Sequence, residues 1–206
     1  MVPIAREVRP AMLVLGITTA IMHFQFGFQL VWPAWLAWLA LLVLFRDFKR
    51  TIPALPLAVV SPVDGRVIDI KQSVYDPYLK RTAQAISLRQ SLLGEFNVHS
   101  PVEGKVQNLW VRSSKWFTGS ELALWVQTDE QDDAVVVANL DSILRHASCK
   151  INAGEKLGQG QRCGFIAFSC VVVIYLPSTA HIGIDAGQCV RAGSDQLAEF
   201  VHEAET

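Results

Sequence analysis

Two short phrases in this sequence carry acidic residues at matching positions. The first, Ser61–Val67, reads SPVDGRV, and the second, Ser100–Val106, reads SPVEGKV. Such a repetition either duplicates a structural part or places two carboxylates, Asp64 and Glu103, for acid–base chemistry. Asp-Gly and Glu-Gly are also hairpin signals, because glycine tolerates positive φ and aspartate bonds its own backbone. The pattern alone favours two turns and leaves a catalytic role open for each carboxylate.

Residues that bind metals are scattered along the chain. Its four cysteines and five histidines show no CxxC pair and no metal-ligand spacing, so we expect no metal site. Cysteines without a pairing pattern indicate a reducing compartment. The net charge of −1 over 206 residues argues against the broad basic surface that nucleic-acid-binding proteins use.

The strongest physical signal is an uncharged apolar run from Ala11 to Phe45. As a single helix it would be about 50 Å long, whereas the hydrocarbon core of a bilayer is about 30 Å thick. We expect a break near Pro33 or the polar residues Gln25 and Gln29. Residues 1–50 are therefore predicted to be an α-helical membrane hairpin, whose second arm either spans the bilayer or enters it in part. Basic residues on both flanks put both ends in the cytoplasm. The alternative is a helical hairpin buried in a soluble protein.

Residues 51–206 differ in composition from the apolar run, because prolines are followed by short runs rich in valine and isoleucine. The runs that predict strands are LAVV, RVIDI, KVQNLWV, LALWVQT, DAVVVANL, GFIAF and VVVIYLP. INAGEKLGQG from Ile151 and IDAGQCVRAG from Ile184 form a second repeat. Two pairs of related hairpins predict a mainly β domain, either a pseudo-symmetric sandwich or a barrel. Only Tyr78–Leu93 and Leu140–His146 indicate short helices.

Four phrases carry a resemblance over nearly the whole chain. They are LFRDFKRTIPALPLAVVSPVDGRV, NVHSPVEGKV, RCGFIAFSCVVVIYLP and IDAGQCVRAG. In this order they resemble the membrane junction, histidine segment, cleavage segment and closing phrase of short bacterial phosphatidylserine decarboxylases. An ordered, almost gapless match of this length is more specific than any single motif.

This resemblance implies an enzyme of the cell (inner) membrane, with its main domain on the cytoplasmic side. It would convert phosphatidylserine to phosphatidylethanolamine, with that lipid and the bilayer as partners and homo-oligomeric assembly left open. The family's cofactor is a pyruvoyl group that the chain makes by cutting itself, and no metal is implied. The group's ketone forms a Schiff base with the substrate amine and acts as an electron sink. By position, Asp64 and His99 would be the base and its orienter, and Cys170 the nucleophile.

The sequence departs from the family pattern at three positions. The family's Gly-Ser pair falls on Ser169 and Cys170, and Phe96 stands where relatives carry a histidine. A thiolate attacks a carbonyl readily, so Cys170 keeps cleavage feasible, although it equally suits a small buried strand residue. Replacing glycine at 169 costs about 1 kcal/mol or more where the backbone needs glycine.

These departures leave two further interpretations open. The first is a non-catalytic relative that keeps the fold as a lipid-binding or scaffolding protein at the membrane. The second is a biotinyl or lipoyl carrier, which repeated hairpins also resemble, but the chain lacks the Met-Lys-Met setting of the modified lysine.

Overall fold

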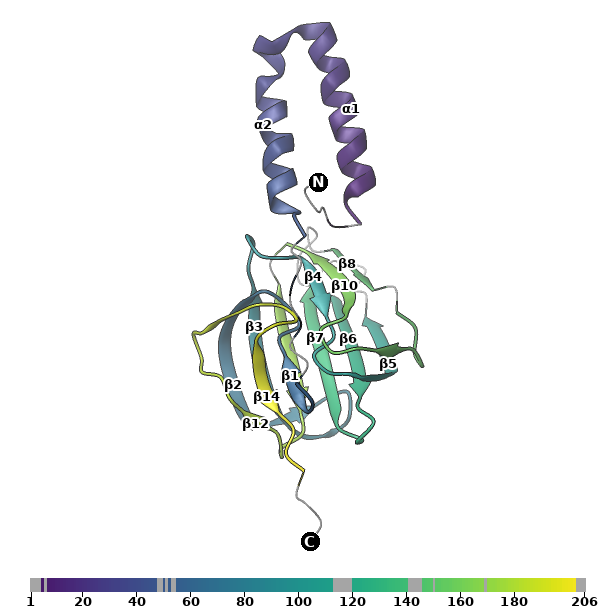
Figure 1. The fold of residues 1–206 in the computed structure, drawn as a ribbon, viewed down its shortest axis with the longest axis vertical. Coiled ribbons are helices and arrows are strands. Elements are labelled where there is room, and N and C mark those ends of the chain that lie inside the picture. The colour runs from purple at the N-terminus through teal and green to yellow at the C-terminus, as the bar shows by residue number, and fades with distance from the viewer. Residues whose placement is uncertain are drawn as a thin grey trace. The chain divides into compact units, whose positions relative to one another are not determined.

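The structure is a computed structural model that describes residues 5, 7–47, 50, 52, 55–112, 120–140, 146–149, 151–168 and 170–202. The chain divides into two compact units, Met1–Lys49 and Arg50–Thr206. The first unit is helical and the second is built from β-strands (Figure 1).

The helical unit is an antiparallel pair (Figure 1). It consists of α1 (Arg9–Phe26) and α2 (Phe28–Leu44). Gly27 joins them with φ of +75°, a conformation that glycine adopts without strain. The indole Nε1 of Trp38 donates a hydrogen bond to the Met12 carbonyl at 3.1 Å, which ties the two helices together.

The break in the apolar run lies at Gly27, between Gln25 and Gln29, while Pro33 stays inside α2. The prediction of a transmembrane hairpin is wrong, because no helix in the described part of the chain is long and apolar enough to cross a membrane. Gly27 divides the apolar run into helices of only 18 and 17 residues, at the lower limit of the roughly 17–25 residues that span a bilayer.

The β unit contains one large sheet that curls into a half-barrel (Figure 1). Its eight strands stand in the order β13-β2-β3-β11-β7-β6-β5-β9. They are β13 (Cys189–Val190), β2 (Gly65–Asp76), β3 (Arg81–Gln90), β11 (Val171–Leu176), β7 (Asp133–Leu140), β6 (Ser120–Gln127), β5 (Gly104–Arg112) and β9 (Lys156–Leu157).

Two three-stranded sheets complete the described part of the β unit, in the orders β1-β14-β12 and β4-β10-β8. Their strands are β1 (Ala58–Val60), β14 (Gln196–Glu199), β12 (His181–Ile182), β4 (Asn97–His99), β10 (Arg162–Ala167) and β8 (His146–Cys149). The mainly β class predicted from the sequence is confirmed. Each of the seven predicted runs forms a strand, namely β1, β2, β5, β6, β7, β10 and β11.

The short helix predicted over Tyr78–Leu93 is wrong. Arg81–Gln90 forms β3, which is hydrogen-bonded to β2 along one edge and to β11 along the other. Pairing on both edges outweighs a moderate local helix propensity. The second predicted helix, Leu140–His146, falls mostly on residues outside the described ranges.

The repeated phrases make equivalent contacts with the two later repeats. The Gly187 N–H donates to the Val67 carbonyl at 2.8 Å, and in the second copy the Gly154 N–H donates to the Val106 carbonyl at 2.7 Å. Both glycines have φ of +92°, a conformation that disfavours residues with a Cβ. These matching contacts agree with the pseudo-symmetry that the repeats predict.

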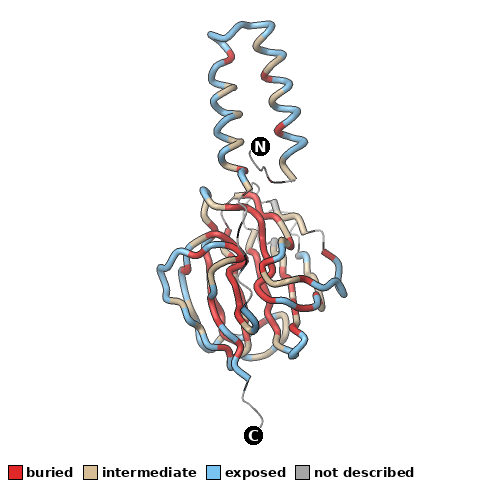
Figure 2. The backbone as a smooth tube through the Cα atoms, in the orientation of Figure 1, coloured by how far each residue is buried: buried red, intermediate tan, exposed pale blue. Residues whose placement is uncertain are grey.

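A single buried cluster joins all three sheets (Figure 2). It includes Leu197 of β14, Ile166 of β10 and Ile174 of β11, each with no more than 1% of its surface exposed. Cys170, which precedes β11, belongs to the same cluster. Cys170 is therefore buried among residues that come from all three sheets.

Candidate functional site

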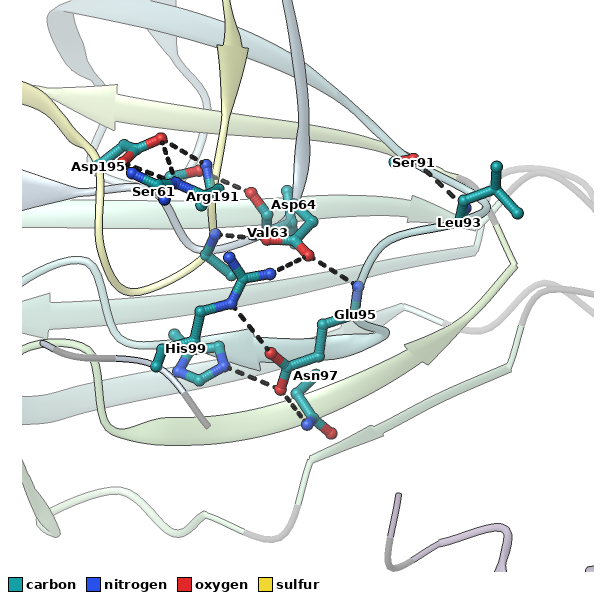
Figure 3. A network of polar contacts seen from close by, with 12 residues as sticks. Ser61, Val63, Asp64, Ser91, Leu93, Glu95, Asn97, His99, Arg191 and Asp195 are labelled. Atoms are coloured by element: carbon teal, nitrogen blue, oxygen red, sulfur yellow. Dashed lines mark hydrogen bonds and ion pairs between the residues drawn. The ribbon is translucent and has the colours of Figure 1, made fainter. Parts of the chain in front are cut away.

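The two repeated carboxylates lie in different surroundings. Asp64 is buried, and it accepts hydrogen bonds from the Ala192 N–H at 2.7 Å and the Glu95 N–H at 2.8 Å. Its Oδ2 also lies 2.5 Å from the guanidinium of Arg50. Glu103, at the matching position of the second phrase, is exposed. Asp64 is thus built into a polar network, shown in Figure 3, whereas Glu103 lies at an exposed turn.

His99 lies in the same network, at the end of β4 (Figure 3). Its Nδ1–H donates to the Gly160 carbonyl at 2.7 Å, and its Nε2 lies 3.3 Å from Oε1 of Glu95. The amide of Asn97 contacts the same carboxylate oxygen. The acid in direct contact with the imidazole is therefore Glu95 and not Asp64.

Arg50 connects the two buried acids. Its Nη2 bonds Asp64, and its Nε lies 3.8 Å from Oε2 of Glu95. One guanidinium between two carboxylates leaves an excess negative charge, which a protonated imidazole would neutralise. His99, with its Nε2 3.3 Å from Oε1 of Glu95, is placed to supply that cation.

The electrostatic surroundings change the proton affinity of His99. Burial is the largest single influence and by itself lowers the pKa of the imidazole. Hydrogen bonds to Glu95 and Gly160, with the charges of Glu95 and Asp64, outweigh burial and raise the pKa above its ordinary value. His99 consequently holds a proton at a pH where a free histidine has begun to lose it.

Cys170 is held against the end of β3. It is buried, with its Sγ 3.6 Å from Oε1 of Gln90, and the Gln90 N–H donates to the Cys170 carbonyl at 2.9 Å. The next N–H along the chain, that of Ser91, donates to the Asp64 carbonyl at 2.8 Å. Two consecutive N–H groups therefore bring the segments of Cys170 and Asp64 together.

Three other positions bear on the predicted site, namely Ser169 and Phe168 just before Cys170, and Phe96 in the histidine segment. Ser169, the predicted residue on the other side of the cleaved bond, lies outside the described residues. Phe168 has φ of +63°, a left-handed conformation that costs a non-glycine residue about 1–2 kcal/mol. Phe96, at the position where the resemblance implies a histidine, is buried and packs edge-on against Phe165 with ring centroids 6.3 Å apart. That position is therefore apolar in this chain.

Glu95 and Gln90 are two site residues that the sequence analysis missed. Neither belongs to a motif. Gln90 contacts Cys170 from 80 residues away, and Glu95, although close to His99 in the sequence, is held by hydrogen bonding to Asp64, 31 residues away. The available signal for Glu95 was an acidic residue in the otherwise uncharged segment GEFNVH. Within the described ranges, no group of three or more histidine, cysteine and acidic residues is arranged to hold a metal ion.

Comparisons with known proteins agree on a single family. The profile described as phosphatidylserine decarboxylase matches residues 40–198. The phosphatidylserine decarboxylase proenzyme of Nitrosomonas europaea is 35% identical, with 96% of this chain and 95% of the relative covered. The proenzyme of Burkholderia vietnamiensis is also 35% identical, with 96% of both chains covered. No solved structure gives a significant match. Because the profile covers most of the chain and the identity extends over nearly all of it, this chain belongs to the phosphatidylserine decarboxylase family.

Proposed function

We propose that this chain is a self-processing phosphatidylserine decarboxylase that makes phosphatidylethanolamine and uses Cys170 where its family uses serine. The observation that carries the proposal is the junction at the end of β3. There, successive N–H groups of Gln90 and Ser91 hold the segments of Cys170 and Asp64 together. The names of the bacterial relatives support the substrate, and the word proenzyme in those names supports self-processing.

Cleavage begins with the thiol of Cys170. The sulfur adds to the carbonyl carbon of residue 169, the C–N bond breaks, and the amine of residue 170 takes a proton, which leaves a thioester. Loss of the Cα proton of residue 170 then breaks the Cβ–S bond, and the sulfur departs as the thiocarboxylate of residue 169. The dehydroalanine that remains takes a proton at Cβ to become an imine, which water hydrolyses to a ketone and ammonia. The sulfur atom therefore ends on the larger fragment.

His99 is the residue we assign to proton transfer in these steps. Its Nδ1–H is directed to the Gly160 carbonyl, so Nε2 carries the lone pair of the neutral ring. A proton taken up at Nε2 is stabilised by Glu95 at 3.3 Å. Asp64 adds a second negative charge that favours the imidazolium.

The surroundings of Cys170 fit a pyruvoyl group. The position is buried in the apolar core, and the side-chain amide of Gln90 lies within 3.6 Å of the thiol sulfur. A neutral ketone fits a site lined by an uncharged amide, whereas a charged group buried there would need a charged partner. When formed, the group supplies a ketone that withdraws electrons from the substrate's carboxyl-bearing carbon.

We further propose that the chain acts at the cytoplasmic face of the cell membrane. Both helices expose large apolar side chains, including Leu13 (67%), Phe24 (89%) and Leu30 (75%). Apolar surface of this kind is favourable against the interfacial region of a bilayer. Contact of the helical unit with that surface would keep the β unit near its lipid substrate.

Intact-mass analysis of the purified chain tests the proposal. After incubation with phosphatidylserine vesicles, the chain should separate into two fragments on a denaturing gel. The smaller should begin at position 170 with a ketone-reactive terminus, and the larger should carry the extra sulfur at its end. Cys170→Ala should stay intact, whereas Cys170→Ser should still be cut.

A folded chain that stays intact and forms no ethanolamine lipid would overturn the proposal. If that chain still bound phosphatidylserine vesicles in preference to phosphatidylcholine vesicles, the non-catalytic lipid-binding function would replace it. The departure from Gly-Ser and the apolar environment of Phe96 favour this second function.

A further inference from the structure

A cavity of about 720 Å³ opens beside Asp64, and three arginines line it. They are Arg66 on β2, Arg89 on β3 and Arg191 just after β13. Gln90, which contacts Cys170, is part of the same lining. Three arginine side chains therefore line a cavity next to the candidate active site.

Arg66 and Arg89 face each other directly across the β2–β3 ladder. Directly opposite residues of an antiparallel pair have side chains on the same face, and like charges there are destabilising. In the described part of the chain, no carboxylate lies within ion-pair distance of either guanidinium. An anion bound between them would remove this repulsion.

Arg191 is fixed at the same cavity by Asp195. Its guanidinium Nη2 lies 2.9 Å from Oδ1 of that acid, and its backbone N–H donates to Oδ2 at 2.9 Å (Figure 3). The strand before it places Cys189 opposite Arg66, so β13 holds Arg191 close to the other two arginines. The third guanidinium is thus positioned before any ligand binds.

Planar guanidinium groups bind phosphate oxygens with paired hydrogen bonds, so three of them around one cavity indicate a phosphate-containing ligand. The apolar side chains in the same lining, Leu93 at 78% exposed and Ile68 at 41% exposed, indicate that the ligand also has an apolar part. A phospholipid combines these two features, and free phosphate has only the first.

We propose that this cavity binds the phosphodiester of a phospholipid headgroup between Arg66, Arg89 and Arg191, with the acyl chains toward Leu93 and Ile68. The inference rests on the proposed function, because it names where the lipid substrate of that site would bind. Such binding would direct the headgroup toward Asp64 and Gln90, on the side of Cys170.

The internal repeat provides a matched control. Lys105 occupies in the second phrase the position of Arg66 in the first, but it faces neutral Gln127 where Arg66 faces Arg89. Its other neighbour, Lys156, has the carboxylate of Asp129 at 3.5 Å. Lys105→Gln therefore removes the same kind of charge from a place that lacks the arginine pair.

The test is isothermal titration of the full chain carrying Cys170→Ala, so that binding is measured without cleavage. The probe is dihexanoyl phosphatidylserine below its micelle concentration. Arg66→Gln with Arg89→Gln should weaken binding about tenfold or more, and Lys105→Gln should leave it unchanged. Arg66→Lys with Arg89→Lys should recover only part of the affinity, because an ammonium group keeps the charge but not the paired hydrogen bonds of a guanidinium. The melting temperature of the double glutamine variant should not fall, because a like-charge pair is removed.

Two further ligands distinguish the sources of the phosphate. Glycerophosphoserine should bind more weakly than the short-chain lipid, since it lacks the apolar part, and inorganic phosphate should bind weakest. Inorganic phosphate binding as tightly as the lipid would overturn the lipid assignment. Equal lipid binding by the parent and the double glutamine variant, or equal losses with Lys105→Gln, would overturn the site itself. A wild-type chain that binds the lipid but is never cut would instead contradict only the proposed catalysis.

Discussion

Oε1 of Glu95 lies 3.3 Å from Nε2 of His99, whereas the acid of the repeated phrase, Asp64, bonds Arg50 and two backbone N–H groups. The two carboxylates therefore have separate tasks. Glu95 contacts the imidazole of His99 directly. Asp64 holds three segments of the chain together and acts on His99 only as a more distant negative charge.

Glu95→Gln should lower the pKa of His99. Burial already opposes protonation, and the substitution removes the charge that most directly counteracts it. An NMR titration of the His99 ring in the full chain with Cys170→Ala measures this pKa. Glu103→Gln, the change at the exposed turn, serves as the control and should leave the titration unaltered. An unchanged pKa in Glu95→Gln would show that Glu95 does not set the charge of His99.

Glu95→Gln should also move self-cleavage of the otherwise native chain toward lower pH. A histidine base works in its neutral form, and the raised pKa of His99 delays that form to higher pH. Cleavage rates from intact-mass time courses between pH 5 and pH 9 test this, with Glu95→Asp as the conservative variant that should retain the parent profile. A uniform fall in rate without a displaced profile would indicate a structural role only.

Protonation of His99 should make the folded state more stable at low pH than at high pH. Its folded pKa lies above the ordinary value of 6.5. Between pH 6.5 and the folded pKa, the folded state thus binds more protons than the unfolded state. The free energy of unfolding therefore falls as the pH rises through this range. This stabilisation is fully present below pH 6.5 and is lost above the folded pKa. Urea denaturation of the parent and of His99→Gln across pH 5 to 9 measures it, and parallel pH curves would contradict it.

Asp64→Asn should destabilise the β unit far more than Glu103→Gln. Removing the buried charge leaves Arg50 without its closest partner, at a cost of about 3–5 kcal/mol for a broken buried pair. The change at exposed Glu103 should stay within about 0.5 kcal/mol. The free energies of unfolding from chemical denaturation give the comparison. Similar values for the two variants would mean that the repeated acids are equivalent after all.

Gly65→Ala and Gly104→Ala should destabilise the protein by similar amounts. A Cβ at Gly65 would lie 2.2 Å from the Arg89 carbonyl oxygen, and one at Gly104 would lie 2.2 Å from the Gln127 carbonyl oxygen. Relieving either overlap requires a backbone shift, which costs about 1–3 kcal/mol or more. Gly183→Ala meets no atom within 4 Å and is the control, with little change in melting temperature. Unequal losses at Gly65 and Gly104 would argue against the pseudo-symmetry.

Much of the β unit could be predicted from local sequence. Runs such as DAVVVANL and VVVIYLP are rich in β-branched residues and bounded by turn residues, so they specify strands wherever they lie in the fold. The segment TAQAISL in β3 lacks this bias, and its strand state depends on pairing with both β2 and β11. The apolar run likewise predicted a helical hairpin correctly, but no helix in the described part of the chain is long and apolar enough for the predicted crossing of a membrane.

The sequence by itself determined the family and the mainly β class, because these depend on residue order and short-range backbone preferences. The prediction that the two repeated phrases are hairpin turns is wrong, because β1 and β2, and likewise β4 and β5, belong to different sheets. Only the tertiary structure decided which acid contacts His99 and why Asp64 differs from Glu103. Arg50, Glu95 and Ala192 reach Asp64 from positions 14, 31 and 128 residues away along the chain. Hydrogen bonds and ion pairs act over a few ångströms in space. The local sequences SPVDGRV and SPVEGKV therefore do not specify which distant residues the fold brings to each carboxylate.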